Sequence, residues 1–478
     1  MVVGFYTDDM PARGQTFVVG VETDDYPLNV FLLVSWLPAK KRSLRCGSRL
    51  LCWRRRMTTS APAPTFREAL RFWFKLGCIS FGGPAGQIAV MHRELVERKR
   101  WIEESRFLHA LNFCMLLPGP EATQLATYCG WLLHGVRGGL AAGVLFVLPG
   151  AVTLWVLSWI YVAYGEVAAV AAVFHGLKAT VLAIVVAAVL RIGRKALTGP
   201  VAWTLAAAAF GALFFLRLPF PLVVFGALAI GFAGGRWASR AFGVSEKTEP
   251  ALPVAAVPIS STLKMAGIGL ALWFAPVLVA AALQPGGVFV QLGWFFSKAA
   301  VVTFGGAYAV LPYVGQQAVE HYHWITPGHM LDGLAFAETT PGPLIMVLQF
   351  VGFLAGWRQP GALAPLAAGT LGAAMTTWVT FVPTYLFILI GAPYVERLRG
   401  DVRLNAALAA VTAAVVGVIL NLAVWFALQV VFPVHAAVDW FALVVGVAAL
   451  VALERFKVGI LPVITAGGLL GLAWSWLT

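Results

Sequence analysis

The chain has 478 residues, of which 60% are hydrophobic and 12% are charged, and its formal net charge is +13. A soluble globular domain carries about 25% charged residues, so this composition excludes that class and indicates a polytopic membrane protein. Basic residues in such chains gather in cytoplasmic loops, so the positive charge predicts contact with membrane lipids and gives no reason to expect a nucleic-acid partner.

Residues 1–56 differ from the rest of the chain. They are mixed in charge and hold one apolar run, "LNVFLLVSWL", that is too short to span a bilayer. No small-residue cleavage site follows a basic stretch, so a signal peptide is not predicted. Met57 begins the polar segment "MTTSAPAP", and we expect residues 1–56 to be an upstream start-site extension or a disordered tail.

The remaining chain predicts an all-α polytopic membrane protein with about 13 helical segments, some of them broken or re-entrant. Nine full spans are expected, near 138–164, 167–190, 199–216, 219–235, 257–283, 362–391, 404–430, 438–453 and 458–477. We divide this part into a first membrane repeat (57–250), a linking span (251–287) and a second membrane repeat (288–478).

The two repeats are recognised by superposing the chain on itself with an offset of 223 residues. Between 75 and 120, 14 of 46 positions are then identical without a gap. The matches include Phe81-Gly82-Gly83 with Phe304-Gly305-Gly306 and Pro118-Gly119-Pro120 with Pro341-Gly342-Pro343. Matches at Trp, Gly and Pro rather than Leu and Ala indicate an internal duplication.

The loops indicate that the two repeats have opposite orientations. Loop 91–106 holds five Lys/Arg and its counterpart 314–329 holds none. Loop 164–167 has no Lys or Arg, whereas its counterpart 394–403 has three. Loop 191–195 has three Lys/Arg, whereas its counterpart 432–437 has none. Since basic loops face the cytoplasm, the second repeat is predicted to be inverted relative to the first.

The FGG and PGP motifs are the predicted site. Each should stop one helix and precede the start of another inside the membrane, where free N–H groups and a positive dipole end favour an anion. Packing kinks without a ligand are the alternative. The neutral donors expected around these turns are Ser80, Thr123, Gln124, Thr303, Thr339 and Thr340.

Charged residues inside apolar segments are costly and therefore informative. Lys75 and Lys298 occupy the same repeat position before each FGG, and either attract an oxyanion or snorkel at the interface. Lys178 lies in mid-span and is a further candidate for the substrate site. Glu121 follows the first PGP and Glu338 precedes the second, so both are candidate proton carriers, although Glu121 also suits a helix cap.

The segment "HYHWITPGH" (321–329) has three histidines but no supporting thiol or carboxylate, so no metal and no cofactor are expected. An enzyme is disfavoured, because no catalytic triad or zinc motif accompanies the near-symmetric repeats.

With these residues, the chain resembles the chromate ion transporter (CHR) family in its long, two-domain bacterial form. The resemblance covers roughly 66–477 and rests on "FWFKLGCISFGGPAGQIAVM", "LLPGPEATQLATYCGWLLHGVRGG" and "LPGA" in the first repeat, and on "FSKAAVVTFGGAYAVLPYV" and "GLAFAETTPGPLI" in the second. It implies a multi-pass protein of the bacterial cytoplasmic membrane that exports chromate, driven by the membrane potential or a proton gradient, with sulfate as a related anion.

Three alternatives to a chromate exporter stay open: a sulfate or molybdate permease, an anion channel and an intramembrane enzyme using Glu121 or Glu338. Sulfate has the same charge and shape as chromate, so the sequence does not rank them. A homodimer is also left open as an assembly.

Overall fold

A computed structural model describes residues 2–5, 19–22, 64–115, 117–165, 167–237, 259–392, 402–432 and 438–477. The chain divides into two compact units, Met1–Thr59 and Ser60–Thr478. In the first unit, strands β1 (Val2–Phe5) and β2 (Val19–Glu22) pair antiparallel, with Val2 opposite Glu22. The start-site prediction at Met57 and most of loops 394–403 and 432–437 lie outside the described residues.

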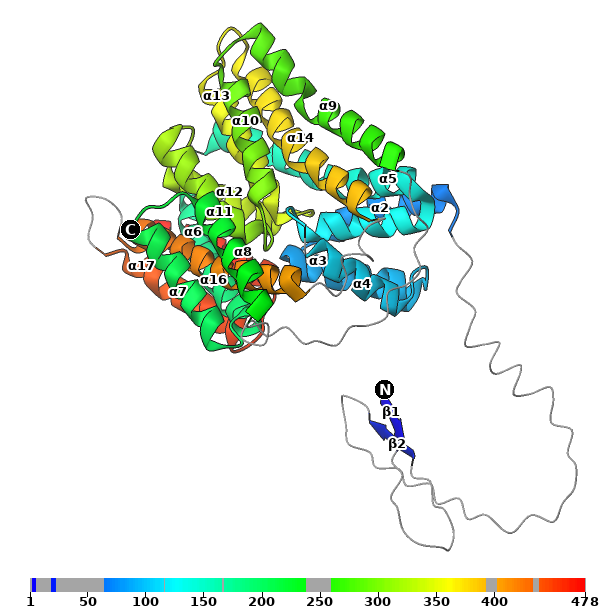
Figure 1. Cartoon of the computed structure of the whole chain (residues 1–478). Coiled ribbons are helices and arrows are strands. Elements are labelled where there is room, and N and C mark those ends of the chain that lie inside the picture. Colours follow the sequence, from blue (N-terminus) through cyan, green and yellow to red (C-terminus); the bar gives the residue numbers. More distant parts are fainter. Residues whose placement is uncertain are drawn as a thin grey trace, which may run out of the picture. The chain divides into compact units, whose positions relative to one another are not determined.

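The second unit is all-α over its described residues, as predicted (Figure 1). Its first half contains α2 (Phe66–Ile79), α3 (Gly83–His92), the π-helix η1 (Arg93–Arg98), α4 (Glu104–Cys114), α5 (Glu121–Tyr164), α6 (Ala168–Ala196), α7 (Pro200–Phe214) and α8 (Phe220–Trp237). Helix α9 (Ile259–Leu283) follows. The second half contains α10 (Val288–Val302), α11 (Ala307–Gln316), the π-helix η3 (Gln317–His321), α12 (Pro327–Thr339), the 3-10 helix η4 (Leu344–Met346), α13 (Val347–Arg358), α14 (Pro365–Gly391), α16 (Val402–Val431), α17 (Trp440–Glu454) and α18 (Ile460–Leu477).

Each of the nine expected spans is a helix or part of one. The described residues contain sixteen α-helices rather than about 13, because each FGG separates two helices. By length and composition, six of the helices in the described ranges are able to cross a membrane: α5, α6, α9, α14, α16 and α18. Three expected spans, α7, α8 and α17, are instead among the shorter apolar helices.

The first long helix, α5, joins two elements that were expected to be separate. Residues 121–133 follow the first PGP, and the expected span begins near 138. The backbone leaves the helical conformation at His134 and Gly135, where φ of Gly135 is +61°. This left-handed value suits glycine, so α5 is a short helix and a long span joined at a kink.

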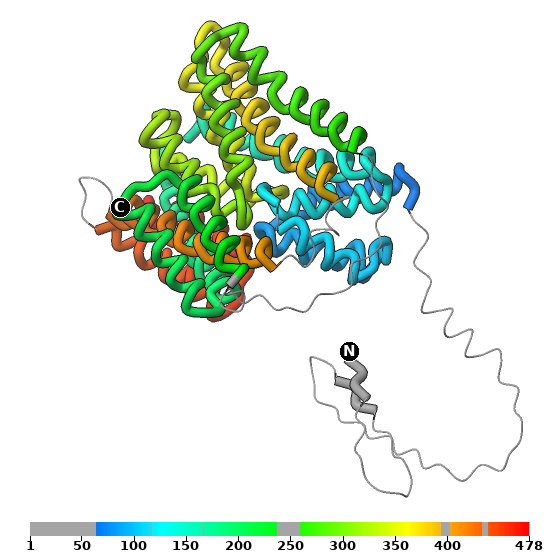
Figure 2. Tube along the Cα trace, viewed as in Figure 1, coloured from blue at the N-terminus to red at the C-terminus, as the bar shows by residue number. Residues whose placement is uncertain are grey.

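The two halves interlock rather than standing side by side. In one bundle, α2 packs on α5, α5 packs with α13 and α14 of the second half, and α14 also contacts α9 and α10. In the other bundle, α6 packs with α16, α17 and α18, while α7 and α8 pack with α16. The colours in Figure 2 show this mixture: cyan α5 runs among green and yellow helices, and green α7 and α8 lie by orange and red ones. Each bundle therefore contains helices from both halves of the chain.

Helix α2 leads into the first FGG motif, and its sequence explains where it begins and which face it buries. Thr65 and Glu68 form a capping box, in which the Thr65 backbone N–H donates to the Glu68 carboxylate over 2.8 Å. Phe72, Trp73 and Leu76 form its buried face. These apolar residues at helical spacing determine which side of α2 packs against the core. Ser80 is the C-cap of the helix.

Candidate functional site

Each FGG motif follows the end of one helix and precedes or begins the next, which starts at Gly83 in the first half and, one equivalent position later, at Ala307 in the second. Ser80 caps α2 and Thr303 caps α10, and each hydroxyl donates to the carbonyl four residues earlier, over 2.7 Å and 2.6 Å respectively. Gly82 and Gly306 precede α3 and α11, both with φ of +86°. Glycine is favoured at these left-handed positions. The Ser80 and Thr303 hydroxyls, expected as ligand donors, are engaged by their own helices.

The two PGP motifs also precede helix starts. Pro120 is the N-cap of α5, and Pro343 is the N-cap of η4, which leads into α13. The central glycines, Gly119 and Gly342, have φ of +134° and +104°. These values explain why glycine stands between the prolines.

Each PGP bonds to the FGG region of the other half. The Gly119 N–H donates to the Thr303 carbonyl over 2.7 Å, and the Gly342 N–H donates to the Ser80 carbonyl over 2.9 Å. The same 223-residue offset relates Ser80 to Thr303 and Gly119 to Gly342. We call these contacts the 119/303 crossing and the 342/80 crossing.

At each crossing, the PGP glycine lies against a helix that contains a proline. A Cβ on Gly342 would lie 3.2 Å from the Gly150 Cα, and a Cβ on Gly119 would lie 3.1 Å from the Thr384 Oγ1. Gly150 follows Pro149 inside α5, and Thr384 follows Pro383 inside α14. The chain therefore approaches closely at both PGP motifs, which leaves little room for a side chain.

A carboxylate lies near the helix start at each crossing. A Cβ on Gly306 would lie 3.4 Å from the Glu121 Oε1, and a Cβ on Gly83 would lie 4.0 Å from the Glu338 Oε2. Each glutamate thus faces a helix N-terminus that belongs to the other half. The positive end of a helix stabilises negative charge, whether it comes from a carboxylate or from a bound anion.

The side chains around the two glutamates differ. Glu338 is 1% exposed and accepts a hydrogen bond from the Tyr308 hydroxyl, and its Oε2 has no hydrogen-bond partner among the described residues. Glu121 is half-buried, and the structure records no hydrogen bond for its carboxylate within the described ranges. The Gln87 amide donates to the Gly342 carbonyl and, over 3.4 Å, to the Ser80 carbonyl.

Unpaired polar atoms gather near these turns. The Gln124 Nε2 donates to the Pro118 carbonyl over 2.8 Å, but its Oε1 and the Thr123 Oγ1 are buried without a hydrogen-bond partner in the described part of the chain. Thr339 donates to the Ala335 carbonyl over 2.9 Å, and the Thr340 N–H donates to Phe336. Because buried polar groups are normally hydrogen-bonded, Thr123 and Gln124 have free capacity for a ligand.

The two lysines at equivalent repeat positions are solvent-exposed in this structure. Lys75 and Lys298 are both exposed on their helices. Lys75 lines a cavity of about 700 Å³ together with Arg71, Lys99 and Glu94. That these lysines contribute to an anion site stays a prediction, and such a contribution would be made from the exposed faces of α2 and α10.

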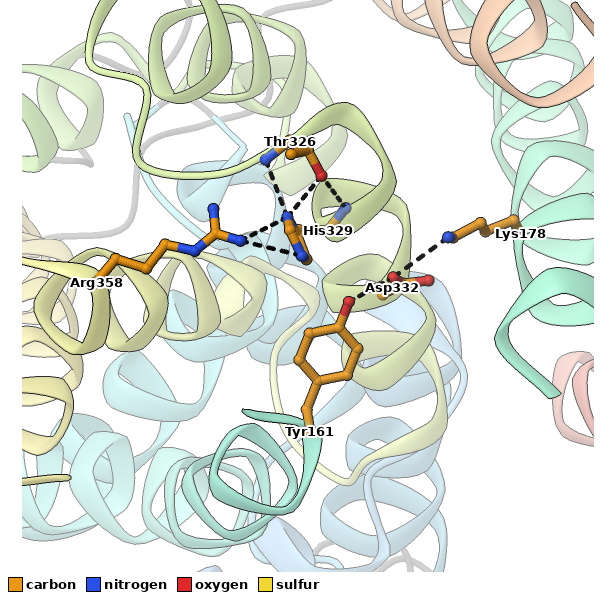
Figure 3. A network of polar contacts seen from close by, with 6 residues as sticks. All are labelled: Tyr161, Lys178, Thr326, His329, Asp332 and Arg358. Atoms are coloured by element: carbon orange, nitrogen blue, oxygen red, sulfur yellow. Dashed lines mark hydrogen bonds and ion pairs between the residues drawn. The ribbon is translucent and has the colours of Figure 1, made fainter. Parts of the chain in front are cut away.

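Lys178 belongs to a separate polar network that the sequence analysis did not identify. Its ammonium lies 3.5 Å from the Asp332 carboxylate, which also accepts a hydrogen bond from the Tyr161 hydroxyl over 2.7 Å (Figure 3). His329 and Arg358 adjoin it, with the Arg358 Nη2 3.3 Å from the His329 Nε2 and the His329 ring centroid 5.9 Å from that of Tyr161, and we include them in the network. Asp332 had an available signal, since it is an ionisable residue within the apolar helix "HMLDGLAFAE". Tyr308 and Gln87 gave no such signal, because their roles depend on contacts with distant segments.

Comparison with known proteins identifies the family. The family model described as "Chromate transporter" matches residues 67–232 and 290–472. A chromate transport protein of Pseudomonas aeruginosa is 34% identical over 371 residues, which covers 76% of this chain and 81% of the relative. One of Cupriavidus metallidurans is 29% identical over 421 residues, covering 86% and 93%. A probable chromate transport protein of Synechococcus elongatus is 28% identical over 364 residues, covering 75% and 84%.

No solved structure gives a significant match. The relatives named above are bacterial transport proteins, and the apolar helices agree with a multi-pass protein of the bacterial inner membrane. With both matched segments and the relatives' coverage taken together, the chain belongs to the chromate transporter family.

Proposed function

We propose that this chain is a secondary transporter that exports chromate from the cytoplasm, driven by the membrane potential or a proton gradient. The relatives from Pseudomonas aeruginosa and Cupriavidus metallidurans are both named chromate transport proteins, and this chain covers most of their length. The chemistry of the crossings supports an oxyanion as the substrate. Under this proposal neither Glu121 nor Glu338 has a catalytic role.

The observation that carries the proposal is the reciprocal pair of crossings. At each one, a helix N-terminus from one half lies near a PGP turn from the other, joined by the Gly119–Thr303 or the Gly342–Ser80 hydrogen bond. A tetrahedral dianion needs several donors and positive helix ends to replace its hydration. The proposed donors are the backbone around Gly82, Gly83, Gly305 and Gly306, with the Thr123 hydroxyl and the second amide N–H of Gln124, whose first N–H donates to the Pro118 carbonyl.

The proposed mechanism is alternating access. The opposite charge pattern of the loops supports an inverted second half, and transporters of that kind bind substrate between broken helices near the bilayer midplane. Both bundles contain helices of both halves. Rocking of one bundle against the other would open the site first to one side and then to the other.

Glu121 and Glu338 are proposed as the proton carriers. Each lies at a helix start close to the proposed anion, so its charge and the anion's charge oppose each other. Proton binding to the carboxylate would remove this repulsion. This linkage would couple anion movement to a proton gradient.

The test is chromate flux into inverted membrane vesicles with an imposed proton gradient, with and without excess sulfate. We expect uphill accumulation in vesicles that contain the protein and none in matched vesicles without it. Flux that only follows its own gradient would indicate a channel. Flux of sulfate without chromate would assign the permease alternative instead.

A further inference from the structure

Asp332 is a buried carboxylate that lies outside the two crossings. It is 3% exposed on α12, and one oxygen, Oδ2, accepts from the Tyr161 hydroxyl and pairs with the Lys178 ammonium at 3.5 Å. The other oxygen, Oδ1, has no hydrogen-bond partner among the described residues. Figure 3 shows Asp332 between Tyr161, from the end of α5, and Lys178, from α6. A carboxylate from the second half is thus held by two residues of the first.

Basic side chains surround this carboxylate. Lys178 is 30% exposed. His329 lies one turn earlier on α12, and the exposed Arg358 places its Nη2 3.3 Å from the His329 Nε2. Arg358 also donates to the Trp324 carbonyl over 3.1 Å. The exposed guanidinium thus contacts the half-buried imidazole, whose ring centroid lies 5.9 Å from that of Tyr161, the residue that donates to the buried acid.

The other elements packed against α12 add few charges. In the described parts of α16 and α18, the one ionisable side chain is Arg403, at the start of α16. On α6, His175 pairs with Asp439 at 3.2 Å. On α12 itself, Glu338 is the further acid and belongs to the 342/80 crossing. Asp332 is therefore the carboxylate that pairs with Lys178.

The start of α12 adds a helix N-terminus to these cations. A Cβ on Gly328, the second residue of α12, would lie 3.3 Å from the Lys178 Nζ. The ammonium thus lies over the first turn of the helix, at its positive end. Pro327 has no N–H and the His329 N–H donates to the Thr326 Oγ1, so the Gly328 N–H is the one of these three that is offered to an anion. An anion there would meet Lys178, His329 and Arg358, and would compete with Asp332 for the same ammonium.

We propose that Lys178, His329 and Arg358 form a second oxyanion-binding site at the start of α12, and that Asp332 holds Lys178 until it binds a proton. This inference rests on the proposed function. An ionised Asp332 and a dianion cannot both be neutralised by one ammonium, whereas a protonated Asp332 leaves Lys178 free for the anion. Anion binding and proton binding at this site therefore support each other.

The experiment measures chromate binding to the purified full chain by calorimetry at alkaline pH, where free chromate is the dianion. Repeating it in two buffers of different ionisation enthalpy gives the number of protons taken up per chromate. For the wild type we expect proton uptake and an affinity that falls as the pH rises, by up to about tenfold per unit for each coupled proton.

The Asp332→Asn variant should take up about one proton fewer per chromate, with an affinity that depends less steeply on pH. Lys178→Gln should weaken binding by about tenfold, the effect of losing one charge-assisted hydrogen bond. Glu454→Gln is the matched control, because Glu454 pairs with Arg194 of the same helix α6 at 2.6 Å but lies outside the network. It should bind like the wild type.

The outcomes separate this inference from the proposed function. Wild-type proton uptake in Asp332→Asn, or unchanged affinity in a folded Lys178→Gln, would overturn the second site while leaving chromate transport in place. No chromate binding by the folded wild type would overturn the proposed function, and this inference with it.

Discussion

The 119/303 and 342/80 crossings each contain one backbone hydrogen bond at an equivalent position, but the side chains around the two bonds differ. At the 342/80 crossing, Glu338 is buried and bonded to Tyr308, and Gln87 donates to the Gly342 carbonyl. At the 119/303 crossing, Glu121 is half-buried, and the residue equivalent to Gln87 is Val310. The two crossings thus have the same backbone contacts, while the polar side chains differ between the halves. This difference predicts that the two crossings tolerate changes unequally.

The largest expected effect comes from filling the glycine of the 342/80 crossing. Gly342→Ala would place a Cβ against the Gly150 backbone at a left-handed φ of +104°, and we expect a loss of about 2–4 kcal/mol in stability. Gly119→Ala should lose less, because its Cβ meets side-chain atoms of Gln124 and Thr384 that are able to move. Thermal unfolding of the detergent-solubilised protein measures both.

Gly211→Ala in α7 is the control for these variants, because a Cβ there meets nothing within 4 Å. It should unfold at the wild-type temperature or slightly above it. Equal losses for Gly119→Ala and Gly342→Ala would contradict the proposed difference between the crossings.

The second expected effect concerns the two glutamates. Glu338→Gln keeps an acceptor for Tyr308 but carries no proton, so uphill chromate accumulation should fall by about tenfold or more, equivalent to 1.4 kcal/mol or more. Glu121→Gln should have a smaller effect, since Glu121 is less buried. In both variants the pH dependence of vesicle flux should change more than the KM.

Glu104→Gln serves as the control for the glutamates, because Glu104 is an exposed residue bonded to His92. Its flux should equal that of the wild type at every pH. A Glu338→Gln protein with wild-type uphill accumulation would remove Glu338 from the coupling mechanism.

A third change makes the two crossings alike. Gln87→Val introduces the residue found at the equivalent position, 310, and removes the amide donor from the Gly342 and Ser80 carbonyls. The expected cost is about 1 kcal/mol of stability, the net contribution of a typical hydrogen bond. Gln291→Val is the matched control, since Gln291 donates to a backbone carbonyl in an exposed turn. If both variants unfold at the same temperature, Gln87 is not what distinguishes the 342/80 crossing.

The smallest expected effect comes from the paired lysines. Lys75→Ala and Lys298→Ala should each weaken chromate flux by about fivefold or less, because exposed charges are screened by solvent. Lys75→Ala should be the weaker transporter of the two, since Lys75 lines a cavity with Arg71 and Lys99. Raising the ionic strength should reduce the difference from wild type, and kinetics unaffected by either substitution would exclude both lysines from the anion path.

The sequence predicted the helices and the starts of the broken ones well, because Gly-Gly and Pro-Gly-Pro act on the local backbone. It did not predict that each PGP bonds to the FGG region of the other half. That pairing joins segments far apart in the chain, and the apolar pattern is the same whichever partner is chosen. The pairing of Lys178 with Asp332 was missed for a similar reason: a mid-span lysine indicates a polar partner but does not say which residue supplies it.

The reciprocal hydrogen bonds also impose an order on biosynthesis. The ribosome completes α2 long before it reaches Gly342, so the Ser80 carbonyl enters the membrane without its final partner, as does the Gly119 N–H before Thr303 is made. A buried backbone group without a partner is costly in lipid. The first half must therefore keep these turns hydrated or covered until the second half is inserted.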